Sequence, residues 1–186
     1  MKVTPLSIPE VLHIEPKVFG DHRGFFLESY SKQRYAEHGL TMEFVQDNIS
    51  RSKKGILRGL HLQHPHDQAK LVSVLEGAVY DVAVDVRVGS PTFGQWVGQE
   101  LIAEKKNQVY VPAGFAHGFA VLTDSALFVY KCTDYYHPET ELGVAWNDPA
   151  LGIDWPLADP ILSEKDGAYG PLSAVPEASL PTYEAP

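Results

Sequence analysis

The chain has 186 residues, with 24 acidic and 15 basic side chains and a formal net charge of −9. This balance disfavours a broad nucleic-acid surface, because binding phosphate backbones needs clustered lysine and arginine. The single cysteine, Cys132, excludes an internal disulfide and is typical of a reducing compartment. No stretch is apolar over the length of a membrane span, and the start MKVTPLSIPEVLHIEP lacks a signal-peptide pattern. We therefore expect a soluble, cytoplasmic protein without membrane or nucleic-acid partners.

Short apolar runs, separated by glycine, proline or aspartate, predict an all-β protein with a few short helices. The best helix candidate is SKQRYAEHG (31–39), with Ser31 as N-cap and Gly39 at its end. Strands are predicted at 70–77, 81–88, 95–102, 107–112, 117–123 and 126–136. The stretch 81–88 alternates valines with polar or small residues, which is typical of a half-buried strand. Many short strands favour a β-sandwich or a jelly-roll barrel.

The length supports a single domain over residues 1–186, with one sizeable core. The sequence contains neither an internal repeat nor a clear linker. The segment 167–186 is rich in proline and alanine and poor in pattern, so we expect an irregular arm that either packs or frays.

The stretch GILRGLHLQHPHDQAKLVSVLEGAVYDV (55–82) raises the question of a metal site, because it contains three histidines. Metal-binding jelly rolls of the cupin type usually carry a sequence pattern that resembles H-x-H, then a glutamate a few residues on, then P-x-G-x-x-H on a later strand. The last part is present in VPAGFAHGF, which ends its motif on His117. The first part differs: Gln63 replaces the second histidine, and Lys70 takes the place of the glutamate. A protonated lysine has no lone pair for a cation, and two imidazoles alone make a poor site.

His64 and His66 lie in HPHDQ, which is typical of a surface turn, so we predict solvated loop histidines. The pocket is therefore predicted to be free of metal and cofactor, with His61, Lys70 and His117 facing it. Such a pocket suits proton abstraction next to a carbonyl. A neutral imidazole is a base at physiological pH, and an ammonium stabilises the oxyanion that forms.

A base of this kind needs a carboxylate to fix its tautomer, and inversion at carbon needs an acid on the opposite face. Tyr130 lies on a predicted strand and shares a face with Phe128. It could supply the proton, although core packing is the alternative for a tyrosine at such a position.

Six segments of the chain occur in this order: DHRGFFLES, FVQDNISRSKKGILRGLHLQ, QAKLVSVLEGAVYDVAVDVRVGSPTFGQW, VPAGFAHGFAVL, YKCTDYYHPETELGVAWNDPALGIDWP and LSEKD. The same order is found in dTDP-4-dehydrorhamnose 3,5-epimerases, and the chain resembles this family over about residues 19–166. The resemblance implies a metal-free jelly roll of the cupin superfamily, usually a homodimer. It also implies epimerisation at C3 and C5 of dTDP-4-dehydro-6-deoxy-D-glucose to dTDP-4-dehydro-L-rhamnose, in dTDP-rhamnose biosynthesis.

The resemblance also implies roles for individual residues. His61 matches the general base, and Asp166, which lies in a predicted terminal loop, matches the carboxylate that pairs with it. Lys70 matches the cation near the C4 oxygen, and Tyr130 matches the acid. The substrate-binding residues that match are Arg23, Glu28, Gln46, Asn48, Arg58, His117 and Tyr136. Of these, Arg23 and Glu28 are expected to reach into the pocket of a partner subunit.

Three alternatives remain open at this point. A single-position epimerase on the same or a related sugar nucleotide would share nearly all of these motifs. A metal-dependent cupin oxygenase or isomerase is disfavoured by the missing H-x-H and by Lys70. A non-catalytic sugar-binding cupin is disfavoured, because a binding protein has no need for an acid-base set such as His61, Lys70, Tyr130 and Asp166. The sequence also leaves open which sugar and nucleotide the protein prefers. It does not show whether the pathway makes cell-envelope rhamnose or a secondary-metabolite sugar.

Overall fold

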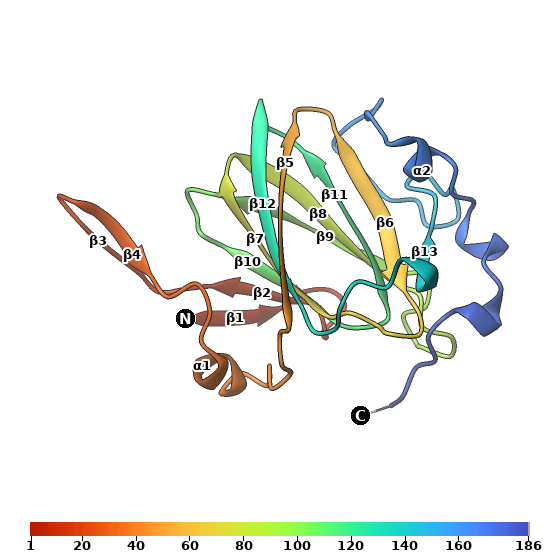
Figure 1. Ribbon diagram of the computed structural model, residues 1–186, viewed down its shortest axis with the longest axis horizontal. Coiled ribbons are helices and arrows are strands. Elements are labelled where there is room, and N and C mark those ends of the chain that lie inside the picture. Colours follow the sequence, from red (N-terminus) through yellow and green to blue (C-terminus); the bar gives the residue numbers. More distant parts are fainter. Residues whose placement is uncertain (186) are drawn as a thin grey trace.

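The computed structural model describes residues 1–185, and two β-sheets make up most of it (Figure 1). The six-stranded sheet has the order β1 (Lys2–Pro5), β2 (Leu12–Glu15), β10 (Gln108–Val111), β7 (Lys70–Glu76), β12 (Ser125–Cys132) and β5 (Gln46–Lys53). The five-stranded sheet has the order β13 (Glu141–Gly143), β6 (Leu57–Gln63), β11 (Phe115–Val121), β8 (Ala78–Asp85) and β9 (Trp96–Ile102).

Neighbouring strands run antiparallel in both sheets, and the sheets enclose an apolar core between them. Val72, Val109 and Phe128 of the larger sheet pack there with Val79 and Phe119 of the smaller one. Side chains alternate along each strand, so one set of residues from each sheet faces this core. The predicted all-β jelly-roll sandwich is confirmed.

The prediction that β8 is half-buried is wrong, because both of its faces are buried. Val82 and Val84 face a second apolar cluster outside the sandwich, which also contains Leu172 and Leu180. On the opposite face Asp81 is only 2% exposed. Alternation identifies the two faces of a strand, but it does not show that a distant segment covers the outer one.

That outer cover includes the C-terminal arm, which packs along its described length to residue 185. It contains two short 3-10 helices, η2 (Leu172–Ala174) and η3 (Glu177–Ser179). The Val88 amide donates to the Pro181 carbonyl at 2.8 Å, and the Tyr183 amide donates to the Val88 carbonyl at 2.9 Å. The arm is thus irregular but fixed by backbone hydrogen bonds.

The predicted helix is present but shorter, as α1 (Lys32–Ala36). The Ser31 hydroxyl caps it by accepting from the Arg34 amide, and Gly39 lies beyond its end with a positive φ of 85°. A second helix, α2 (Glu164–Gly167), contains Asp166, for which the sequence predicts a terminal loop. The Ser163 hydroxyl caps α2 by accepting from the Asp166 amide at 3.1 Å, which fixes the carboxylate on a rigid turn.

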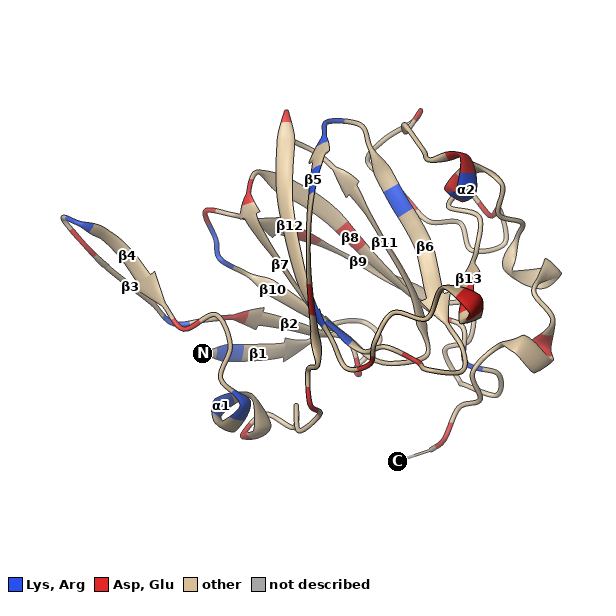
Figure 2. Cartoon of the chain, viewed as in Figure 1, with Lys and Arg blue, Asp and Glu red and all other residues tan. Residues whose placement is uncertain are grey.

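A two-stranded hairpin, β3 (Val18–Asp21) and β4 (Gly24–Leu27), projects away from the sandwich (Figure 1). Its aromatic side chains Phe25 and Phe26 are 58% and 70% exposed. Figure 2 shows basic residues on β6 and on α2, on the opposite side of the molecule from this hairpin.

Within residues 1–185 no helix has the length and apolar character that crossing a membrane requires.

Candidate active site

A cleft of about 300 Å³ opens between the two sheets and collects side chains from both of them. His61 and His117 reach it from β6 and β11 of one sheet. Lys70 and Tyr130 reach it from β7 and β12 of the other. The predicted site residues that line it are Arg58, His61, Lys70, His117, Tyr130 and Tyr136.

Asp166 stands directly behind His61, as predicted. The His61 Nε2 atom lies 2.6 Å from Asp166 Oδ1. The Asp166 side chain is 5% exposed, whereas that of His61 is 33% exposed. Burial would raise the pKa of Asp166, but the hydrogen bond and charge of His61 hold it below its ordinary value. An ionised carboxylate only accepts, so in the neutral form of His61 the Nε2 atom carries the proton and Nδ1 keeps the lone pair that a base needs.

Glycines at the contact between β6 and β11 allow this arrangement. A Cβ atom on Gly59 would lie 2.6 Å from the Gly118 Cα, and one on Gly118 would lie 2.7 Å from the Arg58 carbonyl oxygen. Gly59 also has a φ of 115°, which disfavours any side chain. The backbones therefore approach closely where the strands carry His61 and His117.

His117 has a carboxylate partner that the sequence analysis missed. Its Nε2 atom lies 2.8 Å from Asp81 Oδ2, and both side chains are buried. Burial lowers the pKa of His117, and the Asp81 charge only partly opposes this. An aspartate within an apolar strand must be paired if it is buried, but the alternation of this strand places Asp81 on a face expected to meet solvent.

Lys70 and Tyr130 provide a buried cation and a buried phenol. Lys70 is 9% exposed, and burial lowers the pKa of its ammonium group. A buried ammonium in the cleft disfavours a metal ion there by charge repulsion. Burial raises the pKa of Tyr130 to about 12. Its ring packs against Phe128 with centroids 5.8 Å apart, so the predicted shared face is confirmed.

The mouth of the cleft holds a polar cluster that was also missed. Glu141 of β13 is hydrogen-bonded to Lys165 of α2. It also accepts from the Tyr136 hydroxyl at 2.6 Å and from the Tyr169 hydroxyl at 3.4 Å. Burial raises the pKa of Glu141, but Lys165 and Tyr136 lower it below its ordinary value overall. Lys165 and Tyr169 are 24 and 28 residues from Glu141, so no spacing rule predicts that they meet it.

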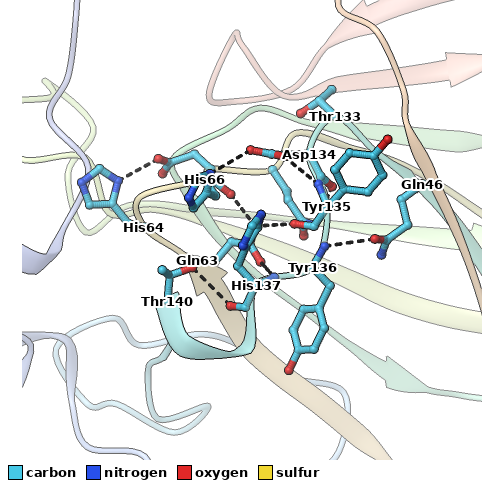
Figure 3. Close-up of polar contacts among 12 residues, drawn as sticks. Gln46, Gln63, His64, His66, Thr133, Asp134, Tyr135, Tyr136, His137 and Thr140 are labelled. Atoms are coloured by element: carbon cyan, nitrogen blue, oxygen red, sulfur yellow. Dashed lines mark hydrogen bonds and ion pairs between the residues drawn. The ribbon is translucent and has the colours of Figure 1, made fainter.

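The loop after β6 and the loop after β12 are joined by the buried amide of Gln63 (Figure 3). Its Nε2 donates to the carbonyls of His66 and Tyr135 at 2.5 and 2.8 Å, and its Oε1 accepts from the His137 amide at 3.2 Å. Tyr136, on the second loop, is held at the cleft by the Gln46 side chain, which accepts from its amide at 3.0 Å.

The loop histidines are more constrained than predicted. His64 pairs with Asp67 at 2.7 Å, and the exposed His66 stacks on His137 with centroids 4.0 Å apart and planes 14° apart. Possible ligand atoms of His66, Asp134 and His137 lie within 4.8 Å of one another. One ion cannot lie in the planes of two stacked rings, so this arrangement is a stacking contact of two imidazoles beside a carboxylate.

The remaining predicted residues lie outside the cleft lining. Gln46 and Asn48 both lie on β5, and the Gln46 Nε2 atom donates a hydrogen bond to Asn48 Oδ1 at 3.2 Å. Arg23, at the hairpin turn, pairs with Asp21, and Glu28 pairs with Arg34. The hairpin β3–β4 projects away from the sandwich (Figure 1), and Arg23 lines a hollow on this hairpin, whereas His61 lines the cleft.

Comparisons with known proteins identify the family of the chain. The family model described as dTDP-4-dehydrorhamnose 3,5-epimerase matches residues 5–174. The dTDP-4-dehydrorhamnose 3,5-epimerase of Pseudomonas aeruginosa is 60% identical over 168 residues, which cover 89% of this chain and 93% of that protein. The dTDP-4-dehydrorhamnose 3-epimerase of Streptomyces niveus is 42% identical over 186 residues, covering 98% and 90%.

Among solved structures, the dTDP-6-deoxy-D-glucose-3,5-epimerase of Legionella pneumophila in complex with dTDP-4-keto-L-rhamnose superposes with a TM-score of 0.97. It is 56% identical, and the match covers 99% of each chain. With a family model over most of its length and relatives of this identity, the chain belongs to the dTDP-4-dehydrorhamnose 3,5-epimerase family.

Proposed function

We propose that this chain epimerises C3 and C5 of dTDP-4-dehydro-6-deoxy-D-glucose to dTDP-4-dehydro-L-rhamnose, in dTDP-rhamnose biosynthesis. The observation that carries the proposal is the His61–Asp166 pair, which faces a cleft shared with Lys70 and Tyr130. The C4 ketone acidifies the hydrogens on both neighbouring carbons, so one base and one oxyanion site serve both positions.

His61 is the proposed base. With Nε2–H donated to Asp166, its Nδ1 lone pair removes the proton from carbon. The imidazolium that forms is stabilised by the Asp166 carboxylate 2.6 Å away. The charge that develops on the C4 oxygen needs a cation, and Lys70 is the proposed partner because its ammonium is buried where solvent screens little.

Tyr130 is the proposed acid. Its raised pKa keeps the phenol protonated at neutral pH, so it has a proton to donate. It lies on β12 of the larger sheet, whereas His61 lies on β6 of the smaller one. A flat enolate held between the two sheets thus meets the base on one face and the acid on the other, as inversion requires.

The substrate diphosphate is proposed to bind at the cleft mouth, where Arg58 is available as a planar donor. Gln46, Asn48, His117 and Tyr136 are the proposed further contacts to the sugar nucleotide. Arg23 and Glu28 are proposed to complete the cleft of a second copy in a homodimer. The exposed Phe25 and Phe26 support this, because a projecting apolar hairpin is stabilised by a partner.

The proposed oligomer is tested by light scattering of the purified chain, and a monomer at micromolar concentration would contradict it. We propose that residues 1–186 form one epimerase domain and that the protein acts in the cytoplasm.

The reaction is tested in deuterium oxide with dTDP-4-dehydro-6-deoxy-D-glucose, followed by proton NMR and mass spectrometry. Deuterium at both C3 and C5 supports the double epimerase. Deuterium at C3 alone would support the second candidate, a single-position epimerase, which the Streptomyces niveus relative motivates. Folded protein that exchanges neither position would contradict both.

A further inference from the structure

One buried side chain forms hydrogen bonds to the peptide groups on both sides of Tyr136 (Figure 3). The side chain is that of Gln63, which is 4% exposed. Its Nε2 atom donates to the Tyr135 carbonyl at 2.8 Å, and its Oε1 atom accepts from the His137 amide at 3.2 Å. Nε2 also donates to the His66 carbonyl at 2.5 Å. Both N–H groups of this amide therefore have an acceptor, and its oxygen has a donor.

These contacts restrict the backbone of Tyr136. The φ angle of a residue sets the orientation of the peptide group before it, and the ψ angle sets that of the peptide group after it. Because one planar amide bonds to both peptide groups, it holds both angles of Tyr136 at once. The Tyr136 amide is held as well, since it donates to the Gln46 side chain at 3.0 Å. The backbone conformation of Tyr136 is thus fixed although the residue is 53% exposed.

Gln63 also relates Tyr136 to the proposed base. It lies two residues after His61 on β6, so both side chains point to the face of the sheet that lines the cleft. Tyr136 lines the same cleft from the loop that follows β12, the strand of the proposed acid Tyr130. The Gln63 amide therefore joins the strand of the base to the loop that carries this tyrosine.

Few other contacts hold the backbone at this point. The Tyr136 hydroxyl donates to Glu141, and the His137 ring stacks on His66, but both contacts are made by side chains. Without Gln63, the peptide group before Tyr136 would keep only its bond to Gln46. The peptide group after Tyr136 would have no hydrogen bond to any part of residues 1–185. Its orientation depends on Gln63.

We infer that Gln63 is a positioning residue that holds Tyr136 in the orientation that receives the sugar nucleotide. This inference rests on the proposed function, because Tyr136 is a proposed contact to that ligand. Gln63 acts through Tyr136 and not on the reacting carbons. Without it, binding would have to order the backbone of one more residue, which weakens affinity by a factor of about ten.

The test is a double-mutant cycle with dTDP-glucose, which has a hydroxyl at C4 in place of the ketone and so binds without reacting. Isothermal titration calorimetry gives the dissociation constants. Gln63→Met keeps the length of the side chain but removes its hydrogen bonds, and we expect it to weaken binding about tenfold. In a Tyr136→Ala background the same substitution should change affinity less than about twofold, because the side chain that Gln63 positions is gone.

Turnover followed by NMR separates binding from chemistry. In Gln63→Met the KM for dTDP-4-dehydro-6-deoxy-D-glucose should rise about tenfold while kcat changes less than about twofold, because the His61–Asp166 pair is intact. Thr140→Val is the matched control. It removes the hydrogen bond from the Thr140 hydroxyl to the His137 carbonyl, which is in the same loop but does not flank Tyr136. It should leave KM and affinity unchanged.

Wild-type affinity in folded Gln63→Met would overturn the inference. Equal weakening with and without the Tyr136 side chain would also overturn it, because Gln63 would then act by another route. The same holds if Thr140→Val weakens binding as much. Tyr136→Ala with wild-type affinity would remove both the proposed contact and the inference.

A second variant keeps the test independent of the folding of Gln63→Met, which thermal unfolding verifies. Gln63→Glu retains an acceptor for the His137 amide but cannot donate to the Tyr135 carbonyl, so it should weaken binding in the same way. Wild-type protein that binds no dTDP-glucose would contradict the proposed function itself, whereas wild-type protein that binds it and variants that bind it equally well would contradict only the role of Gln63.

Discussion

His61 and His117 stand opposite each other on the neighbouring strands β6 and β11, and each lies within hydrogen-bond distance of a carboxylate of its own. The pairs differ in solvent access, since His61 is partly exposed to the cleft whereas His117 and Asp81 are buried. A base must meet substrate and exchange protons, which suits His61. A buried neutral imidazole is a fixed hydrogen-bonding group, which suits His117 as a contact that orients the sugar.

Replacing Asp166 with asparagine should abolish the function of His61 as a base. The amide can donate to Nε2 and so favour the wrong tautomer, which leaves Nδ1 protonated. We expect kcat to fall at least about 100-fold, with dTDP binding nearly unchanged. Turnover followed by NMR measures kcat, and calorimetry with dTDP measures binding. Glu164→Gln on the same helix α2 is the control, because Glu164 is exposed. Activity within about threefold of wild type in Asp166→Asn would remove Asp166 from the mechanism.

Tyr130→Phe should separate proton removal from inversion. His61 can still remove a proton and return a deuteron on the same face, so exchange into deuterium oxide should persist. Net formation of the inverted sugar should fall about 100-fold or more, because the acid on the other face is lost. Mass spectrometry reports the exchange, and proton couplings report the configuration. Tyr135→Phe, in the following loop and exposed, is the control. Exchange and inversion falling together would argue against Tyr130 as the acid.

Much of this architecture was predictable from local patterns. Period-two alternation and turn residues identified the strands, and the motifs around His61 and His117 led to residues that do share one cleft. Asp81 was missed because alternation placed it on a face expected to meet solvent. Glu141 was missed because its partner, Lys165, is 24 residues away and meets it only through the pairing of β13 with β6. Tertiary contacts of this kind leave no periodic signal.

Lys70→Met should make the protein more stable and less active. Turnover should fall about 100-fold or more because the oxyanion loses its cation. At pH 7 the free energy of unfolding should rise by about 1–3 kcal/mol, because an apolar chain of similar length replaces a buried charge. Urea unfolding and NMR turnover measure the two effects, and Lys53→Met at an exposed position of β5 is the control.

The stability gain of Lys70→Met should depend on pH. Burial lowers the pKa of Lys70 in the folded protein below its unfolded value, so folding disfavours the protonated form. That penalty is present at neutral pH and is relieved as the pH rises through the lowered pKa towards about 10.5. The gain should therefore shrink in alkaline buffer, and a gain that stayed constant with pH would contradict a buried charge as its cause.

The His117–Asp81 pair predicts a loss of stability in mild acid. Burial lowers the pKa of His117 in the folded protein, while in the unfolded chain it titrates near about 6.5. Below that pH the unfolded chain binds a proton that the folded protein resists, so the free energy of unfolding falls until the lowered pKa is reached. In His117→Gln this part of the pH dependence should disappear. Urea unfolding between pH 5 and 8 tests it, with His22→Gln on the exposed hairpin turn as control. Equal slopes in wild type and His117→Gln would show that other groups cause the acid sensitivity.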